Sequence, residues 1–73
     1  MTINNFSTLS ETKTELGQRL KAYRLSLNLT QAQLAENSGV SLGAIKSFER
    51  SGSASLDTLL PLLKALSLLG NAD

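Results

Sequence analysis

The sequence contains no cysteine and no histidine. Without cysteine the chain can form neither a disulfide nor a thiolate metal site, and without histidine it lacks the commonest general base and metal ligand. A serine without a histidine or a suitably placed lysine has no base to activate it, and the six acidic residues are scattered along the chain. These absences argue against an enzyme and against a bound metal or other cofactor, and they favour a binding module.

Long apolar runs are also missing. No apolar run is long enough to span a bilayer, and the N-terminus lacks the basic and then apolar pattern of a signal peptide. We therefore expect a cytoplasmic protein that does not contact a membrane. The net charge is only +1, so attraction to phosphate must come from where the seven lysines and arginines lie. The 73 residues are enough for one small domain.

Residues 30–49, TQAQLAENSGVSLGAIKSFE, contain two short helical patterns separated by a turn with a glycine. Thr30 is expected to cap the first helix, with Gln33 completing a capping box. Gly39 can end that helix in the left-handed conformation, and Ser41 can cap the next one. Two helices that cross steeply over such a short turn form a helix-turn-helix.

Three residue types support this interpretation by their spacing. Ala35 is small, as it must be where the second helix crosses the first, Gly39 follows in the turn, and Ile45 can fill the space between the helices. The alternative is an ordinary helical hairpin in an all-α domain.

The flanking residues predict two further helices. We expect residues 1–11 to be a flexible N-terminal arm and a helix to begin after Thr12, which has Glu15 as a capping-box partner. This helix should end near Leu27, before a left-handed Asn28. Its apolar face recurs at helical spacing and consists of Leu16, Leu20, Tyr23 and Leu27.

A leucine-rich helix should follow, capped by Ser55 and complemented by Asp57 near its positive end. Pro61 should kink this helix or confine the segment before it to a separate turn. Residues 12–69 then form one all-α domain of four or five helices, followed by a tail at 70–73.

The leucine-rich helix has too many leucines for one buried stripe, so we expect part of it to meet a second copy of the chain. The predicted dimer contacts are Leu60, Leu63, Leu66, Leu68 and Leu69.

The second helix of the motif could enter the major groove of DNA, with its N-terminal half toward the base edges. Lys46 can donate to a guanine or a phosphate, Ser47 is an adaptable partner, and Leu42 can pack on a thymine methyl group. Because Leu42 discriminates bases poorly, DNA shape and dimer spacing should supply much of the specificity. The predicted DNA-binding residues are Gln31, which would face a phosphate, and Ser41, Leu42, Gly43, Lys46, Ser47 and Arg50.

The stretch LGQRLKAYRLSLNLTQAQLAENSGVSLGAIKSFERSG and the leucine-rich helix resemble the Cro/C1-type (Xre) helix-turn-helix family over residues 15–66. The resemblance implies a lambda-repressor-like fold and a double-stranded DNA operator as ligand. It also implies a partly buried ion pair between Arg24 and Glu49. The matching positions are Arg24, Leu29, Thr30, Gln31, Leu34, Ala35, Gly39, Val40, Ser41, Ile45 and Glu49.

Within that family, FERSG at 48–52 and SLDTLLPLLKAL at 55–66 are similar to HipB-type antitoxins. The similarity implies a bacterial, nucleoid-associated repressor that is a homodimer, regulates its own toxin–antitoxin operon and also binds a HipA-like kinase toxin. One alternative is a phage-type repressor or Cro protein. Another is a protein-interaction module in which the helices serve only as a scaffold for binding a partner such as a toxin.

Overall fold

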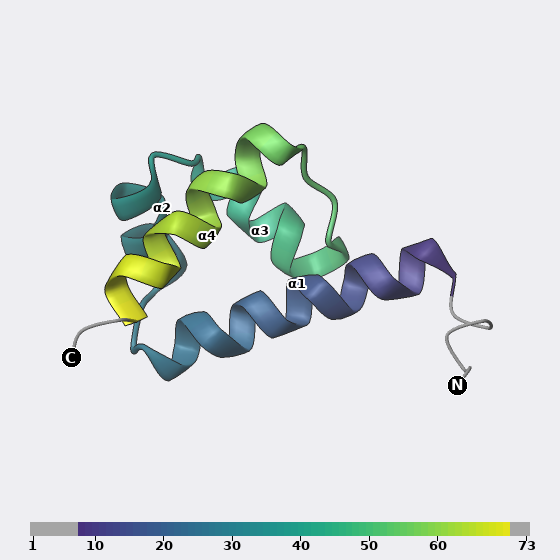
Figure 1. Cartoon of the computed structure of the whole chain (residues 1–73), viewed down its shortest axis with the longest axis horizontal. Coiled ribbons are helices and arrows are strands. Elements are labelled where there is room, and N and C mark those ends of the chain that lie inside the picture. Colours follow the sequence, from purple (N-terminus) through teal and green to yellow (C-terminus); the bar gives the residue numbers. More distant parts are fainter. Residues whose placement is uncertain (1–7, 71–73) are drawn as a thin grey trace.

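The computed structural model describes residues 8–70, which contain four helices joined by short loops. The helices are α1 (Leu9–Ser26), α2 (Gln31–Ser38), α3 (Leu42–Ser51) and α4 (Leu56–Gly70). Figure 1 shows α1 as the longest helix along one side of the molecule, with α4 crossing above it. No strand occurs in these residues, which confirms the all-α class. None of the helices in this range is long and apolar enough to cross a membrane.

Helix α1 begins four residues earlier than the sequence analysis predicts. Thr8 is its N-cap: its hydroxyl accepts from the Glu11 N–H at 3.0 Å, and its own N–H donates to Glu11 Oε1 at 2.9 Å. The predicted cap, Thr12, lies inside the helix and donates its hydroxyl to the Thr8 carbonyl. Both threonines precede a glutamate by three residues, and the earlier capping box adds a turn of helix. The predicted arm is therefore wrong at residues 8–11, and the rest of it, residues 1–7, lies outside the described residues.

Both predicted ends of the first motif helix and the predicted start of the second are confirmed, whereas the second continues to Ser51, through residues 49–51 that were expected to form a loop. Thr30 and Gln33 form a reciprocal capping box at the start of α2, with bonds of 3.0 and 2.8 Å. Gly39 ends α2 at φ 77°, and Ser41 caps α3 by accepting from the Ala44 N–H. Asn28 has the predicted left-handed conformation, with φ 60°.

The core is formed by side chains from all four helices. Leu34 of α2, Ile45 of α3 and Leu62 of α4 have no exposed surface, so Ile45 fills the predicted space between the helices. The predicted apolar face of α1 is only partly buried, because Leu16 and Tyr23 remain about half exposed. The complete core consists of Leu20, Leu34, Ile45, Phe48, Leu62, Ala65 and Leu66.

Glycines bring α1 unusually close to α3. A Cβ on Gly17 would collide with the carbonyl oxygen of Phe48. Gly52, which ends α3 at φ 75°, leaves no room for a Cβ beside the Lys13 backbone. Two backbones can approach this closely only where no side chain separates them.

Helix α4 is continuous through Pro61, so of the two predicted alternatives, a kink at that proline or a separate turn before it, the separate turn is wrong. Proline removes one backbone donor, and the packing of Leu62 and Ala65 beyond it holds the helix together.

The start of α4 agrees with the prediction. Ser55 accepts from the Thr58 N–H at 3.3 Å, and Asp57 lies in the first turn. Gly70 is the last residue of the helix and does not begin a tail; residues 71–73 lie outside the described residues.

Candidate DNA-binding surface

The outward face of α3 carries most of the residues predicted to contact DNA. Lys46 and Arg50 are exposed, Leu42 is 38% exposed, and Ser47 is half-buried. A Cβ on Gly43 would meet nothing within 4 Å, so the backbone is open to close approach there. The structure thus places these five residues along one short helix.

The exposed charged side chains of α3 are all positive. Lys46 and Arg50 are exposed, whereas Glu49, its one acidic residue, is only 4% exposed and is paired internally. The surface that α3 presents is therefore cationic although the whole chain is nearly neutral. Ser41 also has a structural role, because its hydroxyl accepts from the Ala44 N–H as the N-cap of α3; this bond does not use its O–H donor.

The ion pair implied by the resemblance is present and is buried. Arg24 Nε lies 2.6 Å from Glu49 Oε2, and Arg24 Nη2 donates to Glu49 Oε1 at 2.9 Å. The third donor, Arg24 Nη1, bonds the Leu29 carbonyl at 2.6 Å. Because the pair is bidentate and nearly inaccessible, it joins the end of α1 to the end of α3 firmly.

Gln31 differs from its predicted orientation. It is half-buried at the start of α2, and its Nε2 donates to Glu49 Oε1 at 3.0 Å, so at least one amide N–H points into the protein instead of toward a phosphate. Sequence reasoning missed this contact because the two residues are 18 positions apart and belong to different helices. The resemblance placed both residues in the motif, but it gave no sign that they touch.

The first turn of α2 also presents free backbone donors. The N–H groups of Thr30, Gln33 and Leu34 all bond within the cap. Those of Gln31 and Ala32 have no partner within residues 8–70. Free N–H groups at a helix N-terminus are suited to an anion such as a DNA phosphate.

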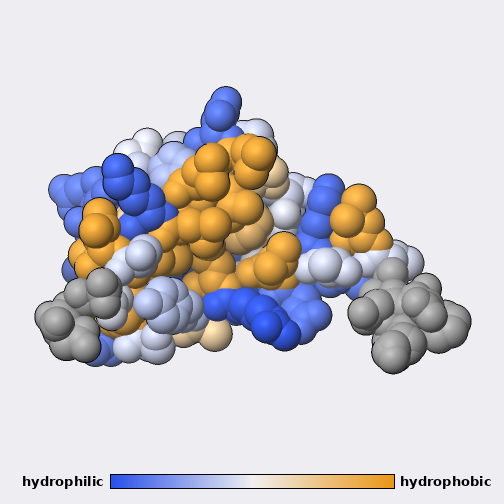
Figure 2. Space-filling model, in the orientation of Figure 1, coloured by the Kyte–Doolittle hydropathy of each residue, from blue (hydrophilic) through white to orange (hydrophobic). Residues whose placement is uncertain are grey.

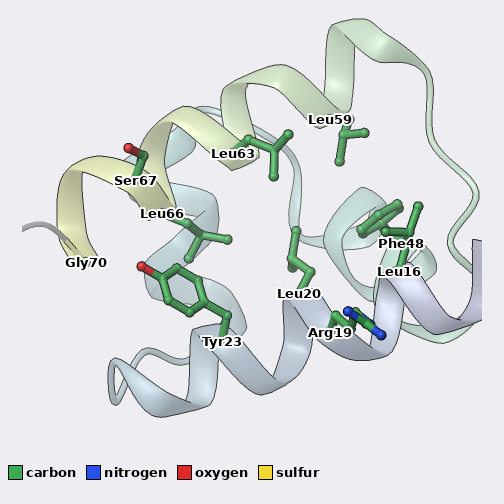
Figure 3. Close-up of a pocket in the computed structure, with 10 residues that line it drawn as sticks. All are labelled: Leu16, Arg19, Leu20, Tyr23, Phe48, Leu59, Leu63, Leu66, Ser67 and Gly70. Atoms are coloured by element: carbon green, nitrogen blue, oxygen red, sulfur yellow. The ribbon is translucent and has the colours of Figure 1, made fainter.

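A separate apolar groove of about 580 Å³ lies between α1 and α4. In Figure 3 the leucines of α4 face Leu16, Leu20 and Tyr23 of α1 across it, with Phe48 of α3 beside Leu16 at one end. Figure 2 shows that the apolar surface covers α4 and extends down toward α1. The groove is lined by Leu16, Arg19, Leu20, Tyr23, Phe48, Leu59, Leu63, Leu66, Ser67 and Gly70.

The five predicted dimer contacts do not form one surface. Leu66 is only 3% exposed and belongs to the core, so the prediction is wrong for this residue. Leu63 lines the groove toward α1, whereas Leu60 and Leu68 lie on another side of α4, near Pro61. Leu69 is 36% exposed. Which leucines of α4 are buried depends on the helices that pack against each of its faces. The number of leucines in the sequence does not reveal this packing.

Comparison with known families agrees with this geometry. The family model described as helix-turn-helix matches residues 20–68, about two thirds of the chain. The chain therefore belongs to the helix-turn-helix family, of the Cro/C1 type, and this class of protein is a DNA-binding transcription regulator. No curated protein matches the sequence.

Proposed function

We propose that this protein is a sequence-specific repressor that inserts α3 into the major groove of operator DNA. The observation that carries the proposal is the outward face of α3, where Lys46 and Arg50 supply positive charge and Gly43 leaves the backbone open. A helix of this kind fits the major groove, where each base pair presents a distinct pattern of donors and acceptors.

Each residue has a separate role in this proposal. Lys46 and Ser47 donate to base edges or phosphates, and Leu42 packs on a thymine methyl group. Arg50, at the end of α3, contacts the phosphate backbone. The free backbone N–H groups at the start of α2 donate to a second phosphate. This contact sets the angle at which α3 enters the major groove.

The repressor is proposed to act as a homodimer. Two recognition helices about 34 Å apart would enter successive major grooves on one face of the duplex. Support comes from the leucines of α4 that remain exposed, because several exposed leucines on one helix of a small domain are typical of an interface. Two sides of α4 could form that contact: Leu63 lies on the groove side, whereas Leu60 and Leu68 lie on the other, and Leu69 is 36% exposed.

The more specific proposal is a HipB-like antitoxin that represses its own toxin–antitoxin operon at the bacterial nucleoid. Its support is the similarity of residues 48–52 and 55–66 to such antitoxins, and the leucine-lined groove offers a surface for a kinase toxin.

The alternative is a phage-type repressor, which would have the same fold and DNA site. An adjacent kinase-like reading frame would favour the antitoxin, and phage genes on either side would favour the alternative.

Fluorescence anisotropy with the protein's own upstream DNA and a scrambled duplex, each at two salt concentrations, tests the DNA-binding proposal. Binding should be tighter to the native sequence and should weaken steeply with salt, because phosphate contacts release counterions. Absent or equal binding to both duplexes would contradict a sequence-specific repressor and would favour the protein-interaction module. Sedimentation of the free protein, measured alongside, should show a dimer.

The double substitution Lys46→Ala and Ser47→Ala locates the site. We expect the upstream duplex to bind at least about tenfold more weakly, on the scale of one lost base contact, while the melting temperature stays near that of the wild type. Lys64→Ala is the matched control, since Lys64 is an exposed lysine on α4, away from α3. An unchanged affinity in the folded double variant would show that α3 does not read the DNA with this face.

A further inference from the structure

The Glu49 carboxylate is a junction between three segments of the chain. It accepts from Arg24 Nε at 2.6 Å, from Arg24 Nη2 at 2.9 Å and from Gln31 Nε2 at 3.0 Å. These donors come from the end of α1 and from the first residue of α2, while Glu49 itself lies near the end of α3. Charge-assisted hydrogen bonds of this kind are short and hold both partners in a defined orientation.

The same arginine fixes the start of α2 from a second direction. Arg24 Nη1 bonds the Leu29 carbonyl at 2.6 Å, and Leu29 directly precedes Thr30, the N-cap of α2. The first turn of α2 is therefore held on one side through its connecting loop and on the other through the side chain of Gln31. The orientation of α2 relative to α3 is therefore fixed. The free backbone N–H groups of Gln31 and Ala32 point in a fixed direction as a result.

We propose that Glu49 is a positioning residue for DNA binding and acts through the Gln31 amide. This inference rests on the proposed function and names a part of that site. A glutamine amide has two N–H donors and a carbonyl acceptor, and the bond to Glu49 uses one donor. In this proposal the other N–H donates to the same phosphate that the free backbone N–H groups of α2 bind. Since the amide is oriented before DNA arrives, little side-chain freedom is lost on binding.

The competing explanation is that the buried pair only stabilises the fold. The double substitution Arg24→Met and Glu49→Leu separates the two explanations. Replacing a buried ion pair by apolar side chains of similar volume is often neutral or stabilising, so this variant should melt at or above the wild-type temperature. It nevertheless removes the acceptor that orients Gln31.

We expect the folded double variant to bind the upstream duplex on the order of tenfold more weakly than the wild type, the scale of one hydrogen bond. Gln31→Ala should weaken the wild type by a similar factor. Added to the double variant, where the amide is no longer oriented, Gln31→Ala should cause little further loss. A purely structural pair would leave the affinity of the folded double variant unchanged.

The outcomes distinguish this inference from the repressor proposal. If the wild type binds the duplex specifically and the stable double variant binds it equally well, the role of Glu49 is overturned and the repressor proposal stands. Wild-type protein that does not bind the duplex would overturn both.

Nuclear magnetic resonance of the wild type provides a test that does not depend on the variant folding. One side-chain amide proton of Gln31 should exchange slowly with solvent, because Glu49 accepts from it, and the other should shift when the upstream duplex is added. Fast exchange of both protons, or no shift of either on specific binding, would overturn the inference.

Discussion

Helix α1 packs against α3 and faces α4 by two different means. Toward α3, glycines remove the side chains that would separate the backbones, and a bidentate ion pair closes the far end of the contact. Toward α4, leucines and Tyr23 face one another across a groove of about 580 Å³. The side of α1 that faces α3 is thus tightly packed and its charges are paired; we call it the closed side. The side that faces α4 is an exposed apolar groove, and we call it the open side.

The proposed DNA site depends on only one of these two relations between helices. The closed side holds α3 and, through Glu49, the start of α2 relative to α1. The open side places no proposed DNA contact, so its surface is available for a second copy of the chain or another protein. Substitutions of buried, paired or closely packed residues should therefore cost much more than substitutions of exposed ones.

The largest effect is expected from Glu49→Ala, which leaves Arg24 buried without its counterion. It should lower the free energy of unfolding by about 3–5 kcal/mol, measured by urea denaturation. Glu15→Ala is the control, because it removes the same kind of ion pair from the surface: the 2.8 Å pair of Glu15 with Arg19 is exposed, and its loss should cost only about 0.3–0.5 kcal/mol. Similar small losses for both variants would show that the buried pair does not hold the closed side together.

A leucine comparison on α4 should give the next largest effect. Leu66 is buried in the core, so Leu66→Ala should lower the free energy of unfolding by about 2–5 kcal/mol. Leu63 is 48% exposed at the groove, and Leu63→Ala should cost clearly less than Leu66→Ala in the same thermal melts. Equal costs would mean that the groove is filled in solution, as it would be in a dimer that covers Leu63.

A glycine comparison should give the smallest effects and opposite signs. Gly17→Ala places a methyl group against the Phe48 carbonyl and should destabilise the protein by about 1–3 kcal/mol or more. Gly43→Ala meets nothing within 4 Å and should leave stability unchanged or raise it by up to about 1 kcal/mol. Circular dichroism melts measure both, and a neutral Gly17→Ala would contradict the close approach of α1 to α3.

Local signals in the sequence predicted most of the helix boundaries. The caps at Thr30 and Ser41 and the left-handed Gly39 and Asn28 depend on residues within four positions of one another, and all are present in the structure. The same local rule misplaced the start of α1, because Thr8 and Thr12 both satisfy it. The family resemblance added the Arg24–Glu49 pair, which no local pattern contains.

The sequence by itself therefore determined the all-α class, the helix-turn-helix and the position of α3. Only the tertiary structure decided which leucines of α4 are buried, why Gly17 is a glycine, and that Gln31 donates to Glu49. Capping and helical periodicity act between neighbours in the chain, so residue order reveals them. Burial, close backbone approach and the Gln31–Glu49 bond depend on which helices meet and at what distance, which requires the packed fold.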